Sequence, residues 1–279
     1  MWIKQYWVMP EALQQAGLHT IDDAMRLQGK VFRQVPTRKT MRVELNIANN
    51  GVGVGKNYFI KQHFGVGWLE IVKNLLSFKK PILGAMTEVI AIQKLDEIGI
   101  ATTPLVAYGQ QGCNPASMRS FIITEDLGDI LSLEDICPSW QSNPPSARLR
   151  QTIIIAAAQL AAKLHSAGLC HRDFYLCHFG LKKSDLAQGN IYYYLLDLHR
   201  MLHKQAVNGD AVMKDVAGLY FSAMDCGLTA KDLTLFKSHY LTQTPGFWRQ
   251  VEARAKTLHA KYHSKKYQQK LTEQNSKLG

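Results

Sequence analysis

Two aspartates carry the residue pattern with the clearest chemistry in this chain. Asp173 lies in the run 171–178, which reads His-Arg-Asp-Phe-Tyr-Leu-Cys-His, and Asp197 closes an aromatic stretch with the composition of a strand. In phosphoryl transfer, one aspartate orients and deprotonates the attacking hydroxyl, and a second holds the Mg²⁺ that neutralises the phosphates. Catalysis of this reaction is mostly positioning and charge stabilisation. The pair therefore predicts a phosphotransferase, with Asp173 as general base and Asp197 as the principal metal ligand.

The residues around these aspartates suggest supporting roles. His178 stands where most kinases place an asparagine that binds a second Mg²⁺. Because neutral imidazole is a poorer Mg²⁺ ligand than an amide oxygen, the sequence leaves open whether one ion or two bind. Only eighteen residues separate Asp197 from Asp215, which leaves little room for a peptide platform and favours a small or glycan acceptor. We expect Asp215 to hydrogen-bond backbone amides of the His-Arg-Asp loop.

A lysine and a glutamate could position the phosphates. Alternation along the predicted strand 58–62 places Phe59 and Lys61 on one face. A lysine there, paired with an acidic residue on a following helix, can bridge the α and β phosphates, and Glu88 is the candidate partner. An exposed strand lysine is the simpler alternative. The two aspartates downstream favour the functional role.

The glycine-rich run 51–55 is a tempting phosphate loop. It ends only six residues before Lys61, so it is predicted to be part of the turn 48–56 between the second and third strands. The loop between the first and second strands, 35–40, has no glycine but two cations and two hydroxyls. The hypothesis is that Arg38 and Lys39 help to hold the nucleotide phosphates or an anionic acceptor.

The order of predicted elements specifies the fold. Hydrophobic patterning predicts five strands with inserted helices, then a joint after residue 124, then a mostly helical half. Adenine is expected to lie against the backbone of Glu125, Asp126 and Leu127. The predicted strands are 31–35, 41–47, 58–62, 105–109 and 120–124 in the first half and 191–196 in the second. The predicted helices are 21–27, 68–78, 84–97, 149–166, 213–225, 230–240 and 245–272.

This order predicts an α+β, protein-kinase-like bilobal fold. The expected β-rich N-lobe is residues 1–127, with a five-strand sheet that binds the nucleotide. The expected C-lobe is residues 128–279, mainly helical, with the catalytic loop, the acceptor site and a basic C-terminal helix.

Composition limits the possible partners and compartments. The net charge of +11 suggests a polyanionic partner such as nucleic acid, anionic lipid or an acidic protein, although a solvated cationic surface is also compatible. Five cysteines without a CxxC motif argue against a disulfide framework or a structural zinc site. The ten histidines include no HExxH motif, and we predict no paired metal spacing among them. The most apolar stretch, 153–162, is too short to span a bilayer, so a cytosolic protein that can sit on a membrane is expected.

Several motifs occur in the order found in a known family. Together they resemble the lipopolysaccharide core heptose kinases of Gram-negative bacteria, over about residues 27–241. The first 25 residues match poorly, and the turn 49–55 is longer than expected. The motifs are KNLLS at 73–77, PILGA at 81–85, FIITEDL at 121–127, SLED at 132–135, NPP at 143–145, HRD at 171–173 with CHF at 177–179, LDLHR at 196–200 and GLYFS at 218–222.

The resemblance implies a donor, a cofactor, an acceptor and a place of action. These are ATP, Mg²⁺, a heptose hydroxyl of the inner-core glycolipid (usually O4), and the cytoplasmic face of the inner membrane. The +11 charge then fits an anionic membrane surface, and no nucleic-acid partner is expected. An acidic protein such as acyl carrier protein would satisfy the same charge. Candidate contact segments are the basic stretch 254–270 and the apolar stretch 68–78. Alternatively, the basic stretch is a solvated helix face and the apolar stretch packs against its own lobe.

Two other classes of function stay open. A kinase of another sugar or small molecule would keep the same residues and change only the acceptor groove. A pseudokinase scaffold is the non-enzymatic alternative, but it would be expected to lose Lys61, Asp173 or Asp197, and all three are present. The motifs leave open the hydroxyl that is phosphorylated, the number of Mg²⁺ ions and the oligomeric state.

Overall fold

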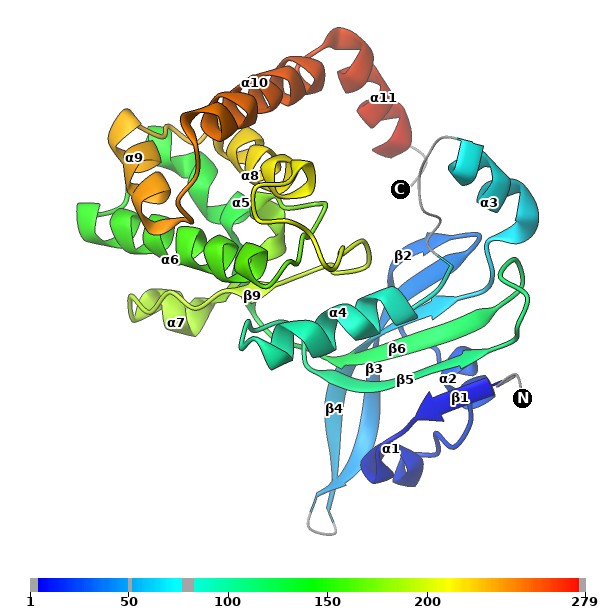
Figure 1. The fold of residues 1–279 in the computed structure, drawn as a ribbon. Helices are drawn as coiled ribbons and strands as arrows, with labels where there is room; N and C mark the ends of the chain where they lie inside the picture. Colours follow the sequence, from blue (N-terminus) through cyan, green and yellow to red (C-terminus); the bar gives the residue numbers. More distant parts are fainter. Residues whose placement is uncertain (1–4, 50–51, 77–82, 276–279) are drawn as a thin grey trace. The chain divides into compact units, whose positions relative to one another are not determined.

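The chain folds into two compact units, and each is described by itself. The computed structural model describes residues 5–49, 52–76 and 83–275. The first, here called the sheet unit, is Met1–Glu97, Thr102–Gly128 and Asp197–Arg200. The second, the helical unit, is Ile98–Ala101, Asp129–Leu196 and Met201–Gly279. The predicted α+β class, with an antiparallel sheet followed by a mainly helical half, is confirmed (Figure 1).

The sheet unit is built on six antiparallel strands in the order β1-β5-β6-β4-β3-β2. The prediction of five strands is wrong by one, because Gln5–Val8 forms an edge strand against β5. The sequence around Gln5–Val8 has no clear strand pattern. The segment is a strand because it pairs with β5. The strands are β1 (Gln5–Val8), β2 (Lys30–Val35), β3 (Arg38–Asn49), β4 (Val52–His63), β5 (Leu105–Gln111) and β6 (Arg119–Glu125).

The predicted turn 48–56 is wrong over most of its length. Strand β3 continues to Asn49 and β4 begins at Val52, with Asn46 opposite Gly55 in the ladder. Residues 50 and 51 lie outside the described part. Gly53 and Gly55 therefore belong to strand β4, where they pair with Ala48 and Asn46 of β3.

Two sets of helices cover opposite faces of the sheet. On one face, α1 (Glu11–Gln15) and α2 (Ile21–Arg26) enclose a core that includes Met41, Ile60 and Phe121. Helix α2 begins with a capping box between Thr20 and Asp23. The other face carries Lys61 and is covered by α4 (Met86–Glu97), which contacts β5 (Figure 1).

Helix α3 (Gly67–Leu76) follows β4 and leaves its apolar residues in solvent. Leu69 is 90% exposed and Leu76 is 77% exposed, whereas Ile71 is buried. The helix was predicted over 68–78, and the end of that range lies outside the described residues. Most of its wide apolar face is thus not used to pack the sheet unit.

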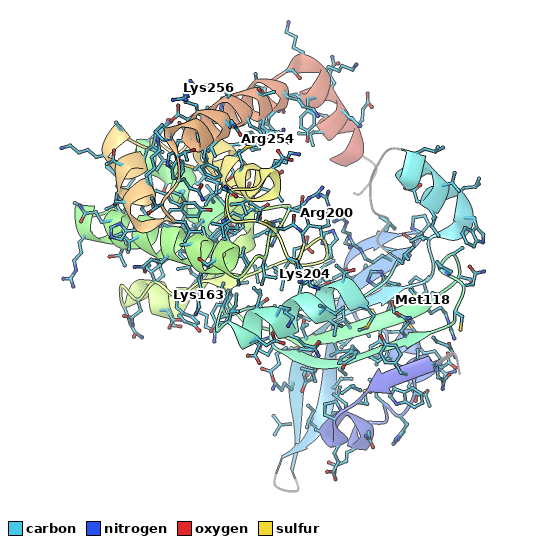
Figure 2. All side chains as sticks on the ribbon, viewed as in Figure 1. Met118, Lys163, Arg200, Lys204, Arg254 and Lys256 are labelled. Atoms are coloured by element: carbon cyan, nitrogen blue, oxygen red, sulfur yellow. The ribbon has the colours of Figure 1, made fainter. Side chains whose placement is uncertain are left out.

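The helical unit surrounds a short three-stranded sheet, β7-β8-β9. The long helix α6 starts at a Ser146 cap, and Lys163 near its end donates to the carbonyl of Gly99 at 2.9 Å (Figure 2). The elements are β7 (Ile130–Ser132), α5 (Leu133–Ile136), η1 (Cys137–Gln141), α6 (Ala147–Ser166), η2 (Leu176–His178), β8 (Phe179–Lys182), α7 (Lys183–Ala187), β9 (Tyr194–Leu195), α8 (Asp210–Ala223), α9 (Ala230–His239), α10 (Pro245–Tyr262) and α11 (Lys265–Asn275).

Two predictions for this unit need correction. The strand expected at 191–196 shrinks to Tyr194–Leu195, because only these residues pair with β8. The single basic helix expected at 245–272 is instead two helices, α10 and α11, with His263 and Ser264 between them. The backbone carbonyl of Ser264 accepts the Tyr267 amide at 3.0 Å, so a new helix starts there. None of the helices in the described part of the chain has the length and apolar content needed to cross a bilayer.

Candidate active site

The sheet unit brings together three of the predicted site residues. Lys61 on β4 places its Nζ 2.7 Å from Glu88 Oε1 on α4 and 3.4 Å from Asp197 Oδ1. Burial opposes the charge of Lys61, but the carboxylates of Glu88 and Asp197 outweigh it, so the pKa of the ammonium is raised. Lys61 is therefore a fixed cation held between two anions.

Asp197 has a backbone conformation that is unusual for a residue with a side chain. Its φ of 58° lies in the left-handed region, where non-glycine residues are strained. The buried side chain of Leu198 anchors the next position, and His199 donates from Nδ1 to Asp197 Oδ1 at 2.7 Å. Nothing in the sequence analysis indicated this hydrogen bond.

Arg38 and Lys39 lie on opposite faces of the sheet. In the β3–β4 ladder Arg38 is opposite His63, on the Lys61 face, because residues two apart in a strand share a face. Lys39 is opposite Gln62 on the other face and donates to Gln28 at 3.3 Å. The structure thus brings only Arg38 to the Lys61 face, and a phosphate role for either cation stays a prediction.

His63 is a polar residue on the Lys61 face that the sequence did not single out. It is 5% exposed, and its Nε2 has no hydrogen-bond partner among the described residues. Burial, followed by the positive charges of Arg38 and Lys61, lowers its pKa to about 3. His63 is therefore a neutral imidazole at pH 7.

The segment expected to contact adenine is firmly held in the sheet unit. The amides of Glu125 and Asp126 donate to carbonyls of the same unit at 3.0 and 3.3 Å. Their carboxylates form ion pairs with Lys56 and Arg42 at 2.5 and 2.7 Å. Within the described residues the Leu127 amide has no backbone partner. Of the three amides, only that of Leu127 is left to bind a base.

The helical unit holds the predicted base. Arg172 has a left-handed φ of 76°, which turns the chain sharply just before Asp173. The backbone carbonyl of Asp173 accepts from the Tyr175 amide at 3.0 Å and from His178 Nδ1 at 2.6 Å. His178 therefore braces the loop through its ring. Because Nδ1 is a donor here, only Nε2 of His178 could bind a metal.

His171 supports the same loop from a buried position. Its Nε2 donates to the carbonyl of Leu196 at 2.8 Å, and its ring stacks on His178 with centroids 5.2 Å apart. Burial, and then the neighbouring His178, lowers the pKa of His171, so the ring is a neutral scaffold.

Asp215 fixes the backbone of the His-Arg-Asp loop, as predicted. Its carboxylate is 2% exposed and accepts from the amides of His171 at 2.5 Å and Arg172 at 2.9 Å. His165 Nε2 also donates to it over a longer distance of 3.4 Å, and the Tyr240 hydroxyl donates to His165 Nδ1 at 2.7 Å. This buried chain of groups fully orients the carboxylate that holds the loop.

Comparison with known proteins decides the family. A model of the lipopolysaccharide kinase (Kdo/WaaP) family matches residues 22–240. The chain belongs to this family.

Individual Kdo/WaaP relatives cover nearly the whole chain. It is 40% identical over 260 residues to an Escherichia coli protein named lipopolysaccharide core heptose(I) kinase WaaP, which covers 88% of this chain and 93% of that protein. A Pseudomonas aeruginosa protein of the same name is 42% identical over 215 residues, 77% of each chain. A solved structure titled WaaP in complex with acyl carrier protein matches with a TM-score of 0.73 and 32% identity, covering 91% of this chain and 99% of that one.

Membership of the Kdo/WaaP family confirms three predictions. The motifs did indicate the right family, the fold is that of a kinase, and the protein is a kinase with a sugar acceptor. A kinase family also implies ATP as the phosphoryl donor.

In this Kdo/WaaP member, two further residues of α8 contact the segment that follows His171-Arg172-Asp173. A Cβ on Gly218 would come within 3.1 Å of the Tyr175 ring, so glycine allows the helix to approach the loop closely. The Ser222 hydroxyl accepts from the Leu176 amide at 3.0 Å. Both belong to the GLYFS motif that marked the family. The motif was visible in the sequence, but these roles depend on contacts with a distant segment.

Proposed function

We propose that this protein transfers the γ-phosphate of ATP to a heptose of the lipopolysaccharide inner core, at O4 of the first heptose. The names of its E. coli and P. aeruginosa relatives support the acceptor. The position O4 rests on the family resemblance of the motifs. The observation that carries the activity is the contact of Lys61 with both Glu88 and Asp197 in the sheet unit. Within the helical unit, Asp215 holds the loop that contains Asp173.

In this proposal Asp173 is the general base. The backbone carbonyl of Asp173 is held by His178, and the amides of the two preceding residues are held by Asp215, so the backbone that presents the Asp173 carboxylate is fixed. A positioned carboxylate accepts the proton of the attacking hydroxyl as the oxygen–phosphorus bond forms, in a direct in-line displacement.

In the sheet unit, Lys61 would bind the α and β phosphates of ATP. Glu88 fixes its direction, and the raised pKa keeps it charged at neutral pH. Arg38 would approach phosphate from the neighbouring strand, and the 125–127 backbone would bind adenine. Lys39 would act only on an acceptor at the other face.

Asp197 is the residue that fits a Mg²⁺ ion. A carboxylate oxygen is the hard ligand that Mg²⁺ prefers, and Asp197 is a carboxylate that is 34% exposed. His178 fits less well, because it offers a single imidazole nitrogen. When bound, Mg²⁺ would supply neutralisation of the phosphate charge. We propose one principal ion, at Asp197.

A carrier protein is the proposed soluble partner. Figure 2 shows Arg254 and Lys256 on α10, and both are exposed, as are four lysines that follow them on α10 and α11. Such a surface suits an acidic partner, and a solved relative is in complex with acyl carrier protein. The lysines are Lys261, Lys265, Lys266 and Lys270.

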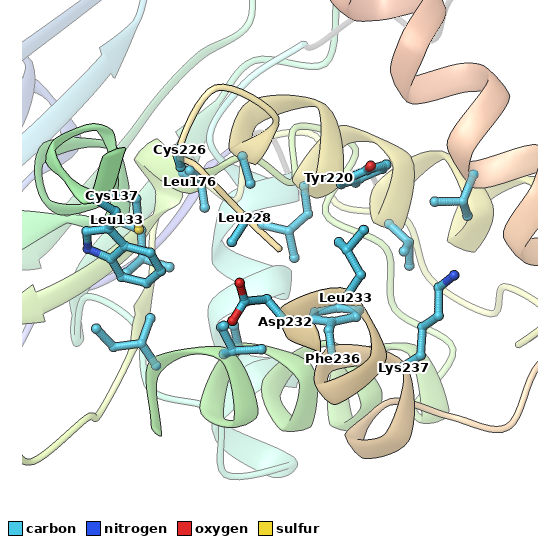
Figure 3. Close-up of a pocket in the computed structure, with 18 of the residues that line it drawn as sticks. Leu133, Cys137, Leu176, Tyr220, Cys226, Leu228, Asp232, Leu233, Phe236 and Lys237 are labelled. Carbon is cyan, nitrogen blue, oxygen red and sulfur yellow. The ribbon is translucent and has the colours of Figure 1, made fainter. Parts of the chain in front are cut away.

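An apolar cavity in the helical unit is the proposed contact for an acyl chain of the carrier protein. An almost wholly apolar cavity of about 100 Å³ lies among α6, α8, α9 and α10, with Leu133, Leu228 and Phe236 in its wall (Figure 3). Asp232 at its edge is neutralised by Arg150 at 2.7 Å.

Co-purification of the carrier protein tests the basic surface of α10 and α11. It should weaken when Lys256 and Lys261 are changed to Glu, and it should survive replacement of Lys94 in the sheet unit.

We further propose that α3 rests on the inner membrane, at its cytoplasmic face. Trp68, Leu69, Val72 and Leu76 are exposed, which is costly in water and favourable at the interface of a bilayer. Sedimentation with anionic vesicles tests this, because Leu69→Ser and Leu76→Ser together should release the protein. Unchanged binding would contradict it.

The function itself is tested by one assay. The protein is incubated with Mg²⁺, ATP and core glycolipid from a strain that lacks this chain, and the product is analysed by mass spectrometry and NMR. The proposal expects one added phosphate at O4 of the first heptose. Phosphate at another sugar, or turnover only with free small sugars, would favour the other acceptor class. Absence of any ATP turnover would favour the scaffold.

A further inference from the structure

Three side chains outside the proposed active site converge on one point of the helical unit. Asp225 follows the end of α8, and His259 and His263 lie at the end of α10, which packs against α8 (Figure 1). His259 Nε2 is 2.8 Å from Asp225 Oδ1, and His263 Nε2 is 3.1 Å from Asp225 Oδ2. The candidate ligand atoms all lie within 4.8 Å of one another.

The spacing of the two histidines is that of a helical metal pair. Residues four apart lie on the same face of a helix, which is how HExxH sites present two imidazoles to one ion. The ring centroids of His259 and His263 are 4.3 Å apart. The sequence prediction that no histidines have metal spacing is therefore wrong, because it required HExxH and did not test HxxxH.

We infer that Asp225, His259 and His263 form a binding site for a divalent transition-metal ion of the Zn²⁺ type. With Zn–ligand bonds of about 2.0–2.1 Å in a tetrahedron, neighbouring ligand atoms lie about 3.3–3.4 Å apart. The two N–O distances, 2.8 Å to Oδ1 and 3.1 Å to Oδ2 of Asp225, lie within about 0.6 Å of that value, and small rotations of the three side chains would bring one carboxylate oxygen and both imidazole nitrogens onto an ion. Two imidazole nitrogens and one carboxylate leave a fourth position for water, and all three side chains are partly exposed.

The backbone around the trio prepares it for a cation. His259 is in the last turn of α10 and His263 is its C-cap, while Asp225 follows the C-cap of α8. Helix C-termini carry partial negative charge, so both helices favour a cation there. The turn that presents Asp225 is fixed, since its carbonyl accepts from Gln141 Nε2 at 2.9 Å.

A second group of potential ligands shows what an unsuitable cluster looks like. His165, Cys170 and Asp215 are also close together, but all three are buried. The oxygens of Asp215 already accept from the loop amides. An ion there would have to displace the hydrogen bonds that hold the His-Arg-Asp loop, whereas the exposed trio would lose only its own two contacts.

The expected role of a bound ion is to clamp α10 to α8. Phe221 lies between them, with its ring centroid 6.5 Å from His259 and 6.1 Å from Tyr175 of the catalytic loop. Helix α8 also carries Asp215 and Ser222, which hold that loop. A metal bridge would therefore stabilise the helix on which the loop rests. This inference does not depend on the identity of the acceptor.

Titration of the full-length, untagged protein with Zn²⁺ alone tests the site. Isothermal titration should show one high-affinity ion per chain, and the melting temperature should rise with Zn²⁺ because the ion binds the folded state. Co²⁺ should give the visible absorption of a tetrahedral N/O site. His259→Ala, His263→Ala and Asp225→Asn should each weaken binding at least about tenfold.

His239→Ala provides a matched control, because His239 is a helical histidine that bonds only within α9. It should bind Zn²⁺ as tightly as the original chain. Equal weakening in the control, or no loss in the three variants, would overturn the proposal. A variant that fails to fold is detected by circular dichroism, and the remaining two then decide the result.

Discussion

The two units use charged side chains in different ways. In the sheet unit Lys61 contacts both Glu88 and Asp197, and Lys61 and Asp197 keep 21% and 34% of their side chains exposed. In the helical unit Asp215 is 2% exposed and bonds backbone amides rather than a cation. The charged groups of the sheet unit are accessible to a ligand. The Asp215 carboxylate of the helical unit is instead occupied by hydrogen bonds that hold a loop.

This difference separates binding from folding. The sheet-unit cluster is open to solvent at Lys61 and Asp197, so its main value is in the ligand that it orients. A buried carboxylate that satisfies buried amides is worth more to the fold, because its loss leaves those groups unpaired. Variants in the sheet unit should therefore change ATP affinity most, and variants behind the loop should change stability most.

The largest expected effect is that of Asp215→Ala. It leaves the His171 and Arg172 amides unpaired and His165 without its acceptor. The free energy of unfolding should fall by about 3–5 kcal/mol, the range for breaking a buried charged contact. Urea denaturation measures it. Asp210→Ala, at an exposed position of the same helix, is the control, and equal losses would contradict the comparison.

Glu88→Gln should show the opposite balance. It weakens the hold on Lys61, a charged hydrogen bond worth about 1.5–3 kcal/mol, so kcat/KM for ATP should drop roughly ten- to a hundredfold. The melting temperature should change little, because Gln keeps an acceptor for Lys61. Steady-state kinetics and a thermal melt on the same sample separate the two readouts. A large loss of stability with normal kinetics would reverse the assignment.

A pH titration can detect His63 in the sheet unit. Its pKa in the folded state is about 3, below the ordinary value near 6.5. Between these two pH values the unfolded chain therefore binds a proton at His63 and the folded chain does not. Stability is unaffected above pH 6.5 and falls as pH drops from there toward 3, by about 1.4 kcal/mol per unit. At pH 5 the loss is about 2 kcal/mol. His63→Gln should lack this part of the slope in urea unfolding, and an unchanged slope would show that His63 is not the titrating group.

Tyr240→Phe is the mildest test. It removes the hydroxyl that donates to His165, a single buried hydrogen bond worth about 1 kcal/mol. The melting temperature should fall by about 2–4 °C, with a small decrease in kcat. Tyr262→Phe removes an exposed hydroxyl in the same unit and should have no effect. If Tyr240→Phe abolished activity without a change in melting, His165 would act in chemistry rather than in positioning.

Local signals made much of this predictable. Strand alternation identified the Lys61 face, and hydrophobic patterning located most of the helices and strands. These features depend on neighbours in sequence.

Features that depend on distant partners were not predictable. Strand β1 exists because β5 pairs with it, and the opposite faces of Arg38 and Lys39 follow from a register that was unknown. The His199 contact with Asp197 and the break before α11 also depend on three-dimensional placement. The trio around Asp225 combines residues 34 and 38 positions apart, so a search for one short motif missed it.

We propose different roles for two carboxylates. Asp173 accepts the proton of the attacking hydroxyl, and Asp197 binds the Mg²⁺ ion that accompanies the nucleotide. Binding of a fluorescent ATP analogue, with and without Mg²⁺, tests it most directly in Asp173→Asn and Asp197→Asn. We predict that Asp173→Asn binds as the original protein does, with full Mg²⁺ dependence, while its phosphoryl transfer falls by about 10²–10⁴-fold. Asp197→Asn should lose the Mg²⁺ dependence of binding. If both variants lost binding alike, or Asp173→Asn kept normal transfer, this division of roles would be wrong.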